Sequence, residues 1–438
     1  MTGGRAFKSG RELLEEQAWD SALRCVQCGY CLPVCPTYCS MGKESASPRG
    51  RINLVKLAAE GKVDVLQDLS EPIDLCLGCR ACETACPVQV PYGHILEAAK
   101  EAIVAERAEG VTWEERLRAG ILRHLFPYPR RLRLAGGLLW LFQRAGLHSL
   151  LRNAQFLAKR APAPFHLGTA LPRVEAPFRR MRRGSLLPAR GPKKGRAAFF
   201  AGCIMDEIFH GVNRSTVDLL RHVGLEVTIP KAQRCCGALH AHQGMRAQAK
   251  RLAKANICAF EASGAEVYVN NAGGCGAMLR EYDRLFQDEP EWRERAARFV
   301  EKIRDISEVL VHYGPPTYRK AWEGVIVYQD SCHLRNVQKV VEEPRQLLRS
   351  IPGAVYVEME DSDRCCGSGG IYNLLHFEES IKILDDKMKV VAKTGASTLV
   401  TTNPGCHLQM RLGAERRKGS APLRVRHLVE VLAEVCLE

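Results

Sequence analysis

Short apolar runs alternate with longer amphipathic segments over the carboxy-terminal half of the chain. The short runs, at residues 197–201, 266–269, 325–328 and 397–400, contain β-branched or aromatic residues, which indicates strands. The longer segments, such as residues 206–222 and 245–262, have helix-like spacing and end close to Gly224 and Gly264. This alternation predicts α/β units around a mostly parallel sheet.

A helix is also predicted in the amino-terminal region. Ser47 suits the N-cap, Pro48 the first helical position, and Gly61 the stop after apolar positions that end at Ala59. Farther on, residues 130–152 mix arginines with apolar residues, which is typical of an amphipathic helix; a segment that lies on a membrane surface or a partner is the alternative. The longest apolar stretch, residues 134–142, is too short to cross a bilayer.

Cysteine is unusually frequent, with 19 among 438 residues. The amino terminus lacks the apolar core of a signal peptide, so we expect a reducing compartment, where clustered thiols are metal ligands or redox groups. Between residues 25 and 86, eight cysteines form two copies of the pattern C-x2-C-x2-C-x3-C-P. This run is typical of bacterial two-cluster ferredoxins.

In such ferredoxins three closely spaced thiolates hold one [4Fe–4S] cluster, and the fourth cysteine of the run reaches the other cluster. The expected ligands of one cluster are Cys25, Cys28, Cys31 and Cys86, and those of the other are Cys76, Cys79, Cys82 and Cys35. A pair of four-cysteine zinc sites is the alternative, but zinc motifs come as two CxxC pairs.

A second cysteine pattern is duplicated after residue 196. Each copy has a cysteine after its first strand, a Cys-Cys-Gly loop, and a cysteine after a later strand; the intervals are 32 and 39 residues in one copy and 33 and 40 in the other. Because ligands gather at the carboxyl ends of strands in open α/β sheets, each set is expected to converge on one metal centre. The sets are Cys203, Cys235, Cys236 and Cys275, and Cys332, Cys365, Cys366 and Cys406.

The order of these motifs resembles a known family. The Cys…Cys-Cys-Gly…Cys pattern is similar to the cysteine-rich CCG domain of heterodisulfide reductases, and the 41-residue step from Cys35 to Cys76 is similar to the helical ferredoxin domain of respiratory dehydrogenases. Together with Ser47-Pro-Arg-Gly-Arg-Ile52 and the GCGAMLREY segment at residues 274–282, the whole resembles the iron–sulfur subunits of glycolate oxidase, also called glycolate dehydrogenase.

One departure from the heterodisulfide reductase pattern bears on the metal. Those copies end in Cys-x2-Cys, whereas Met278 and Gln409 stand at the position of the extra cysteine here. Four cysteines per copy suit a [4Fe–4S] cluster, a smaller cluster or a four-thiolate zinc site. Iron–sulfur is the leading expectation and zinc the alternative.

The net charge of +14 is confined to one region. Residues 97–196 carry 21 basic and 7 acidic residues, whereas residues 1–96 carry 10 and 11, and residues 197–438 carry 32 and 31. The basic region also contains Pro-rich linkers but no zinc-finger, RNP or helix-turn-helix signature, so docking is favoured over nucleic-acid binding. The predicted fold is an α+β multidomain chain: a helical two-[4Fe–4S] ferredoxin domain (1–96), a basic helical and Pro-rich connector (97–196), and two tandem α/β CCG domains (197–320 and 321–438).

The resemblance implies an electron-transfer subunit that is not catalytic alone. It would pass electrons from a separate FAD-containing subunit to a quinone or another acceptor, during oxidation of glycolate or a related 2-hydroxy acid. No nucleotide motif is present: residues 366–370 lack the order GxGxxG and no Walker A sequence occurs, so no organic cofactor and no catalytic residue are predicted.

The expected cofactors are two [4Fe–4S] clusters and a further iron–sulfur cluster, or zinc, in the CCG domains. The expected location is the cytoplasm, with peripheral attachment to the inner face of the cell membrane as an option. Two alternative functions stay open: an iron–sulfur subunit of a lactate or glycerol-3-phosphate dehydrogenase, and a catalytic subunit of heterodisulfide reductase type.

Overall fold

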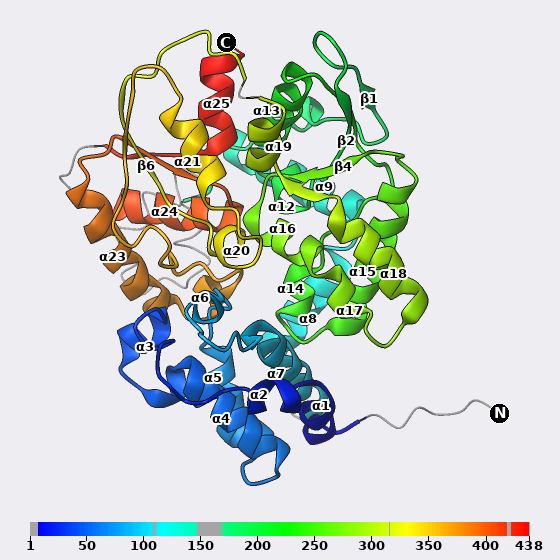
Figure 1. Ribbon diagram of the computed structural model, residues 1–438, viewed down its shortest axis with the longest axis vertical. Helices are drawn as coiled ribbons and strands as arrows, with labels where there is room; N and C mark the ends of the chain where they lie inside the picture. The colour runs from blue at the N-terminus through cyan, green and yellow to red at the C-terminus, as the bar shows by residue number, and fades with distance from the viewer. Residues whose placement is uncertain are drawn as a thin grey trace.

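The computed structural model describes residues 8–107, 111–146, 168, 170–314, 316–417 and 422–437. A helical amino-terminal domain lies at one end of the molecule, and two α/β repeats lie side by side above it (Figure 1). The predicted fold class, a helical cysteine-rich domain followed by a connector and two α/β repeats, is confirmed.

The amino-terminal domain is built almost entirely from short helices around one apolar core. Ser47 caps α4 through its side chain, which accepts from the amide of Gly50, as predicted. Leu14, Val55 and Ala99 are fully buried where α1, α4 and α7 pack together. The helices are α1 (Gly10–Gln17), α2 (Trp19–Leu23), α3 (Pro36–Met41), α4 (Pro48–Ala59), α5 (Ser70–Asp74), α6 (Ala81–Thr84) and α7 (Tyr92–Glu106), with shorter turns at Glu44–Ala46 and Val65–Leu69.

Two elements of the structure cross predicted domain boundaries. The boundary at residue 96 cuts through α7, which packs along α1 and belongs whole to the helical domain; the Gly10 amide donates to Glu106 Oε1 at 2.7 Å. The boundary at residue 196 cuts through β2, and β1 also pairs with the first sheet although it lies in the predicted connector. The connector in between contains α8 (Trp113–His124), α9 (Pro129–Arg144) and a short turn at Pro177–Arg179. No helix in the described part of the chain is long and apolar enough to span a membrane.

Each repeat is built on a sheet with the same strand order. The first sheet runs β1-β3-β2-β4-β5 and the second β7-β6-β8-β9; every pairing is parallel except that of β1, so the predicted mostly parallel sheets are confirmed. The strands are β1 (Leu186–Leu187), β2 (Gly195–Phe199), β3 (Leu225–Thr228), β4 (Val267–Asn270), β5 (Ile303–Asp305), β6 (Gly324–Tyr328), β7 (Ala354–Val357), β8 (Thr398–Thr401) and β9 (Arg424–His427).

Helices cover both sheets and join the two repeats. The predicted helix at residues 206–222 is interrupted: α12 ends at Glu207, and Phe209 leaves helical geometry where its ring packs 5.1 Å from that of His407. The helices of the first repeat are α12 (Ile204–Glu207), α13 (His210–His222), α14 (Ala238–Ala241), α15 (Arg246–Glu261), α16 (Gly273–Arg280), α17 (Tyr282–Leu285), α18 (Pro290–Glu301) and α19 (Ile306–His312). Those of the second are α20 (Cys332–Asn336), α21 (Glu342–Arg349), α22 (Tyr372–Leu375), α23 (Phe377–Lys393), α24 (Pro404–Arg416) and α25 (Leu428–Cys436).

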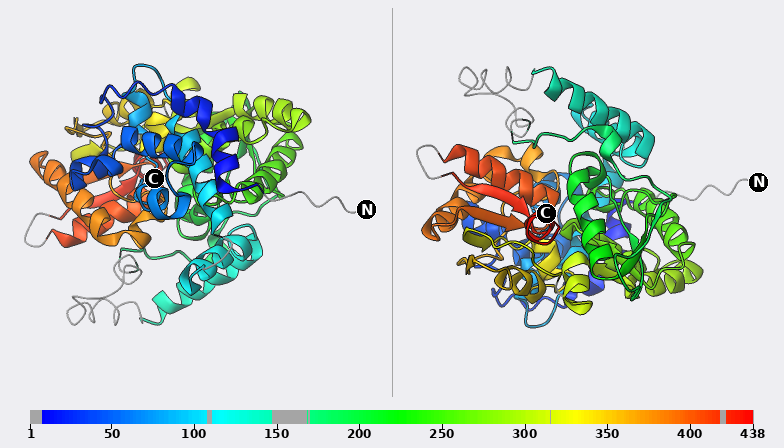
Figure 2. Two further views of the ribbon diagram at one scale, coloured as in Figure 1. Left: turned by 90° about the horizontal axis from the view of Figure 1, so that it is seen from below. Right: turned by 90° about the horizontal axis from the view of Figure 1, so that it is seen from above.

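The two repeats share one continuous core. Helix α13 of the first repeat packs on α25 of the second, and α19 packs on α21, so the contact is reciprocal. Buried Phe199, Ile306, Leu347 and Leu432 belong to the same apolar cluster although they come from both repeats. Figure 2 shows the same pairing from above and below, with α9 standing out from one face of the molecule. This packing turns the cysteine-bearing ends of both sheets toward the helical domain.

Candidate metal centres

The first ferredoxin motif lies in the loop between α2 and α3. Its first three cysteines line one surface pocket, which Cys82 and Cys86 from the second motif also line. Gln27 and Gly29 have φ values of 59° and 87°, so the loop curls between the cysteines. Cys28 is exposed, and the pocket is therefore reachable from solvent. The structure thus brings together the four cysteines predicted for one cluster, with Cys82 of the other predicted set beside them.

The second ferredoxin motif lies between α5 and α7 and is more deeply buried. Burial raises the pKa of the Cys79 and Cys82 thiols well above the ordinary value, and the charges of Cys35 and Cys76 act on both in the same direction. Cys35 therefore lies among the thiols of the second motif, as its predicted ligand set requires. The Gly78 amide and the Tyr92 hydroxyl each donate to Cys76 Sγ at 3.4 Å.

Arg51 is a buried cation between the two motifs, and its role was not predicted from the sequence. It is 1% exposed, and its Nε donates to the carbonyl of Pro72 at 2.6 Å. Burial by itself lowers the pKa of Arg51, but negative charge on Cys76, Tyr92 and Cys35 raises it above the ordinary value. A guanidinium here offsets the negative charge of thiolates and clusters. Arg51 lies within the motif Ser47-Pro-Arg-Gly-Arg-Ile52, which is the sequence signal that could have identified it.

The four cysteines of the first repeat meet at the carboxyl edge of its sheet. Cys203 follows β2, the Cys235–Cys236 pair follows β3, and Cys275 lies in α16 after β4. The Sγ atoms of Cys203 and Cys235 are 3.6 Å apart, and the thiol of Cys236 interacts with those of Cys235 and Cys275. The Tyr282 hydroxyl donates to the Cys236 carbonyl at 2.8 Å and so fixes the loop. The predicted set is brought together.

The second repeat places its four cysteines in the same way. Cys332 begins α20 after β6, Cys365 and Cys366 follow β7, and Cys406 lies in α24 after β8. The thiol of Cys365 interacts with those of Cys332 and Cys366, and the thiol of Cys366 also interacts with that of Cys406. Each set thus forms a row of contacting thiols, as the duplicated spacing predicts.

Glycine is required after each Cys-Cys pair. Gly237 and Gly367 have φ values of 90° and 89°, in the left-handed region that favours glycine. A Cβ on Gly367 would lie 2.7 Å from the Ser380 carbonyl oxygen, and one on Gly237 would lie 3.3 Å from Ala249 Cα. The backbone conformation therefore explains the third letter of the Cys-Cys-Gly motif.

Both thiol sets open into one cavity of about 490 Å³ between the repeats and the helical domain. All eight repeat cysteines line it, and Cys76 and Gly78 of the helical domain lie on its opposite side. A single water occupies about 30 Å³ of liquid, so the space admits polyatomic groups. Free thiols in two converging sets, six of them buried, beside a cavity of this size, fit the sulfur ligands of iron–sulfur clusters.

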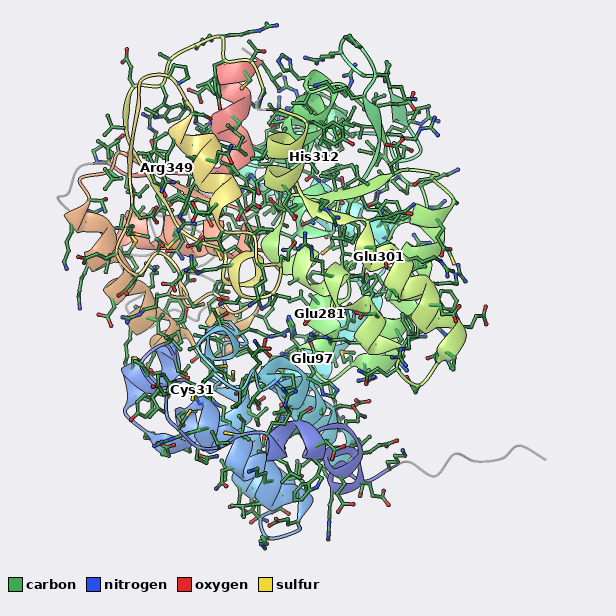
Figure 3. The ribbon with its side chains drawn as sticks, viewed as in Figure 1. Cys31, Glu97, Glu281, Glu301, His312 and Arg349 are labelled. Carbon is green, nitrogen blue, oxygen red and sulfur yellow. The ribbon has the colours of Figure 1, made fainter. Side chains whose placement is uncertain are left out.

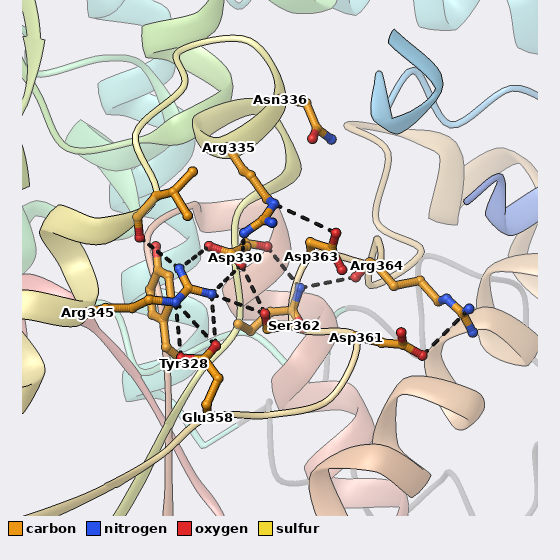
Figure 4. Close-up of polar contacts among 12 residues, drawn as sticks. Tyr328, Asp330, Arg335, Asn336, Arg345, Glu358, Asp361, Ser362, Asp363 and Arg364 are labelled. Carbon is orange, nitrogen blue, oxygen red and sulfur yellow. Dashed lines mark hydrogen bonds and ion pairs between the residues drawn. The ribbon is translucent and has the colours of Figure 1, made fainter. Parts of the chain in front are cut away.

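A buried ion pair holds the loops that carry the second set. Arg345 donates to both carboxylate oxygens of Asp330, at 2.9 and 2.8 Å, and to Ser362 Oγ at 3.1 Å (Figure 4). Asp330 precedes Cys332 by two residues and Ser362 precedes Cys365 by three. Glu358 contacts the same guanidinium at 3.0 Å. The two loops are therefore tied to each other through one arginine.

The second ferredoxin motif is clamped to both repeats. His333 Nε2 lies 2.8 Å from the Gly78 carbonyl, and the Asn336 side-chain amide donates to the Cys79 carbonyl at 2.9 Å. Burial and the nearby His242 lower the pKa of His333 to about 4, which keeps its ring neutral. On the first repeat, Arg80 pairs with Glu281 at 2.8 Å, where the helical domain meets that repeat (Figure 3).

The residues at the missing fifth-cysteine positions are structural. Met278 is 4% exposed within an apolar cluster of the first repeat. Gln409 is fully buried; its side-chain amide donates to Ser380 Oγ at 2.8 Å, and that hydroxyl donates to the Gly367 carbonyl at 2.9 Å. Gln409 thus supports the Cys-Cys-Gly loop through the Ser380 hydroxyl. Of the three cysteines outside the patterns, Cys436 is buried in the core, whereas Cys39 and Cys258 are exposed.

Comparison with known families matches each part of the chain. The 4Fe-4S dicluster domain matches residues 21–90, and the cysteine-rich CCG domain matches residues 197–280 and 326–411. The linker region of the glycolate oxidase iron–sulfur subunit matches residues 113–170. The amino-terminal domain is therefore a 4Fe–4S dicluster domain, and the repeats are CCG domains.

Curated relatives and solved structures agree with these matches. The chain is 47% identical to a probable glycolate oxidase iron–sulfur subunit of Bacillus subtilis over 97% of this chain and 96% of that protein. It is 32% identical to the glycolate oxidase iron–sulfur subunit of Escherichia coli over 95% and 94%. Lactate utilization protein A of an Exiguobacterium species is 33% identical but covers 54% of this chain and 96% of its own length.

A crystal structure of a hypothetical protein from Helicobacter pylori has a similar fold, with a TM-score of 0.53 at 8% identity over 89% of this chain and 68% of that one. Full-length relatives, the matched linker region and the cysteine sets all lead to one assignment. The chain belongs to the glycolate oxidase iron–sulfur subunit family.

Proposed function

We propose that this chain is the electron-transfer subunit of a glycolate dehydrogenase complex. The observation that carries the proposal is the placement of sixteen free cysteines in four sets, two in the helical domain and two around the cavity between the repeats. Iron–sulfur clusters held there supply one-electron transfer, and the protein fixes their spacing and surroundings.

The proposed ligands are the predicted ones. Cys25, Cys28, Cys31 and Cys86 would hold the outer cluster, and Cys76, Cys79, Cys82 and Cys35 the inner one. The proposed ligands of the repeats are Cys203, Cys235, Cys236 and Cys275, and Cys332, Cys365, Cys366 and Cys406. The size of the shared cavity supports iron–sulfur over single zinc ions in the repeats.

The outer and inner cysteine sets of the helical domain have different surroundings, which suggests the direction of electron transfer. Exposed Cys28 makes the outer set accessible to a partner. At the other end of the domain, Cys79 and Cys332 lie close enough for their charges to interact, and Leu77 packs with Cys365 in one small apolar cluster. His333 and Asn336 hold this junction together through the backbone of the inner motif. The junction keeps the distance between the inner and repeat sets short.

The substrate and partners belong to the complex rather than to this chain. We place the oxidation of glycolate in a separate FAD-containing subunit, and a quinone or another acceptor at the far end, with the chain in the cytoplasm at the inner face of the membrane. The proposal includes no nucleic-acid partner. Glycolate is favoured over lactate because the glycolate oxidase relatives match 97% and 95% of the chain, whereas the lactate utilization relative matches 54%.

The test uses the chain and its flavin subunit purified together without oxygen. We expect glycolate to bleach the visible cluster absorption and produce the EPR signal of reduced clusters, and D-lactate and glycerol 3-phosphate to do so at least about tenfold more slowly. Cys28→Ser should abolish cluster reduction, whereas Cys39→Ser, a matched exposed cysteine outside the sets, should leave it intact. Faster reduction by lactate, or glycolate turnover by the isolated chain, would overturn the proposal.

A further inference from the structure

The outward face of α9 is a stripe of leucines. Leu134, Leu138 and Leu141 are between 56% and 68% exposed and recur at three- and four-residue steps. The opposite side of the helix is packed: Leu132 is buried in the core of the first repeat, and a Cβ on Gly136 would lie 2.5 Å from Glu207 Oε2. The inner face is therefore fixed, and the leucines face solvent.

Arginines flank this stripe on both sides. At 3.6 residues per turn, Arg131 falls on one side of the leucines, and Arg130, Arg133 and Arg144 fall on the other. All four are exposed, and α9 contains no acidic residue. The helix therefore combines an apolar ridge with arginines near both of its ends.

The preceding helix repeats the pattern. On α8, Trp113, Leu117 and Ile121 recur every fourth residue and are between 42% and 70% exposed. Leu122 on the packed side is buried, and its carbonyl oxygen lies 2.8 Å from His240 Nε2. Tyr128, between the two helices, is 48% exposed. Two consecutive helices thus present apolar ridges outward.

We propose that the outward faces of α8 and α9 seat the protein on an anionic phospholipid surface. A ridge of leucines and a tryptophan with arginines at its borders matches helices that lie in the membrane interface, where apolar residues enter the acyl boundary and arginines meet lipid phosphates. Figure 2 shows α9 projecting from the body of the molecule, which leaves it free to meet a flat surface. The excess of 21 basic over 7 acidic residues at positions 97–196 supplies long-range attraction.

This inference rests on the proposed function, because a surface-bound chain can deliver electrons to a quinone dissolved in the same membrane. A leucine ridge bordered by arginines, with no acidic residue on α9, favours lipid over a protein partner because lipid phosphates supply the opposite charge beside an apolar layer. A protein partner is therefore an outcome of the test rather than part of the proposal.

The test is flotation of the anaerobically purified full chain with vesicles of phosphatidylglycerol and phosphatidylcholine, compared with pure phosphatidylcholine. We expect binding to the anionic vesicles that weakens at high salt. The triple variant Leu134→Ser, Leu138→Ser, Leu141→Ser should bind the anionic vesicles at least about tenfold more weakly than the wild type. Val355→Ser, an equally exposed apolar residue on β7, is the matched control and should bind like the wild type.

Iron content and visible absorption, measured on the same samples, separate this test from that of the proposed function. Equal vesicle binding by the wild type and the triple variant, or no binding by the wild type, would overturn the membrane proposal even when the clusters are intact. If the triple variant instead loses its flavin subunit during co-purification while the wild type ignores vesicles, the surface is a protein interface and the proposal is wrong.

Discussion

The two repeats share one order of four parallel strands and nearly the same cysteine spacing, yet different residues hold their cysteine loops. In the first repeat the Gln233 side chain accepts from the Ala201 amide at 2.8 Å and donates to the Phe199 carbonyl at 3.2 Å. Arg183, just before β1, pairs with Asp206 at 2.8 Å and donates to the Gln233 and Gly202 carbonyls at 2.9 and 3.3 Å. In the second repeat, Arg345 pairs with Asp330 and donates to Ser362, so it contacts both loops directly. The two repeats share the sheet and the positions of the thiols, but the polar residues that hold the cysteine loops differ between them.

The difference falls where the second repeat meets the helical domain. Cys332 begins the short helix whose His333 and Asn336 reach the backbone of the inner ferredoxin motif. The corresponding start of the first repeat, at Cys203, instead packs near the connector helix α9. Both repeats therefore have an arginine–aspartate pair beside their cysteine loops, and the arginine of the second repeat has Glu358 as an additional carboxylate partner.

The largest expected effect is on stability after loss of the charged anchor. Asp330→Ala leaves Arg345 buried with only Glu358 as a carboxylate partner and should lower the free energy of unfolding by about 3–5 kcal/mol. Gln233→Ala, the counterpart in the first repeat, loses neutral hydrogen bonds and should cost about 1–3 kcal/mol. Anaerobic urea unfolding measures both, with Asp386→Ala on the surface as control. Equal costs would remove the distinction between the repeats.

The second prediction concerns pH and the caps of the last helices. Asp305 caps α19 and His427 caps α25, each within a capping box. Burial raises the pKa of Asp305 to about 7 and lowers that of His427 to about 4. Asp305 therefore stabilises the fold at acidic pH and loses that contribution as pH rises from about 4 to 7; His427 contributes at neutral pH and loses it as pH falls from about 6.5 to 4.

These two slopes are opposite, so the two variants should shift the pH dependence of stability in opposite directions. Asp305→Asn keeps a capping side chain but removes the carboxyl that titrates. The free energy of unfolding should then rise with pH between 4 and 7 more steeply than in the wild type, by up to about 1.4 kcal/mol per pH unit. His427→Asn should give the reverse trend. Urea midpoints measured across this range check both, and two variants with the same slope as the wild type would contradict the assignment.

Substitution of the motif glycines should separate the repeats on a smaller scale. Alanine at either position adopts an unfavourable left-handed conformation that costs about 1–2 kcal/mol. Gly367→Ala adds a close approach to the Ser380 carbonyl and should cost more than Gly237→Ala, where the neighbour is 3.3 Å away. Thermal unfolding and iron content after anaerobic purification report the difference. Gly395→Ala, with a φ of 65° but open space around it, isolates the backbone cost.

The smallest expected effect is on the junction with the helical domain. Asn336→Ala removes the hydrogen bond to the Cys79 carbonyl and should cost about 1 kcal/mol. Hydrogen exchange at the backbone amides of residues 78–82 should speed up, with little change in the first repeat. Glu281→Gln, which weakens the Arg80 pair on the other repeat, is the matched comparison. If both variants perturb the same amides equally, the junction has no preferred repeat.

Much of the architecture could be predicted because its helices and strands follow from local sequence patterns. Ser47, Pro48 and Gly61 mark α4 by capping chemistry, and the duplicated Cys-Cys-Gly intervals place both thiol sets at strand ends. The domain boundaries were less predictable, since α7 continues through residue 96 without any break in its helical pattern.

The polar supports could not be predicted because they depend on tertiary contacts. Arg345 meets Asp330 across 15 residues, and Asn336 meets Cys79 across 257, so neither pair has a local signature. Arg51 lies in a recognisable motif, but only packing shows that its guanidinium is buried beside Cys35 and Cys76. Sequence patterns predict the ligands, and the folded chain shows what holds them.

The most direct test of the central claim, that the cysteine sets hold iron–sulfur clusters, is iron and sulfide analysis of the anaerobically purified chain with EPR after reduction. Two cubanes require about eight irons per chain, and occupied repeats raise the number further. We predict at least that number, with signals from interacting reduced clusters, and loss of about four irons in Cys82→Ser. A chain without iron, or with zinc alone and no EPR signal on reduction, would contradict the claim.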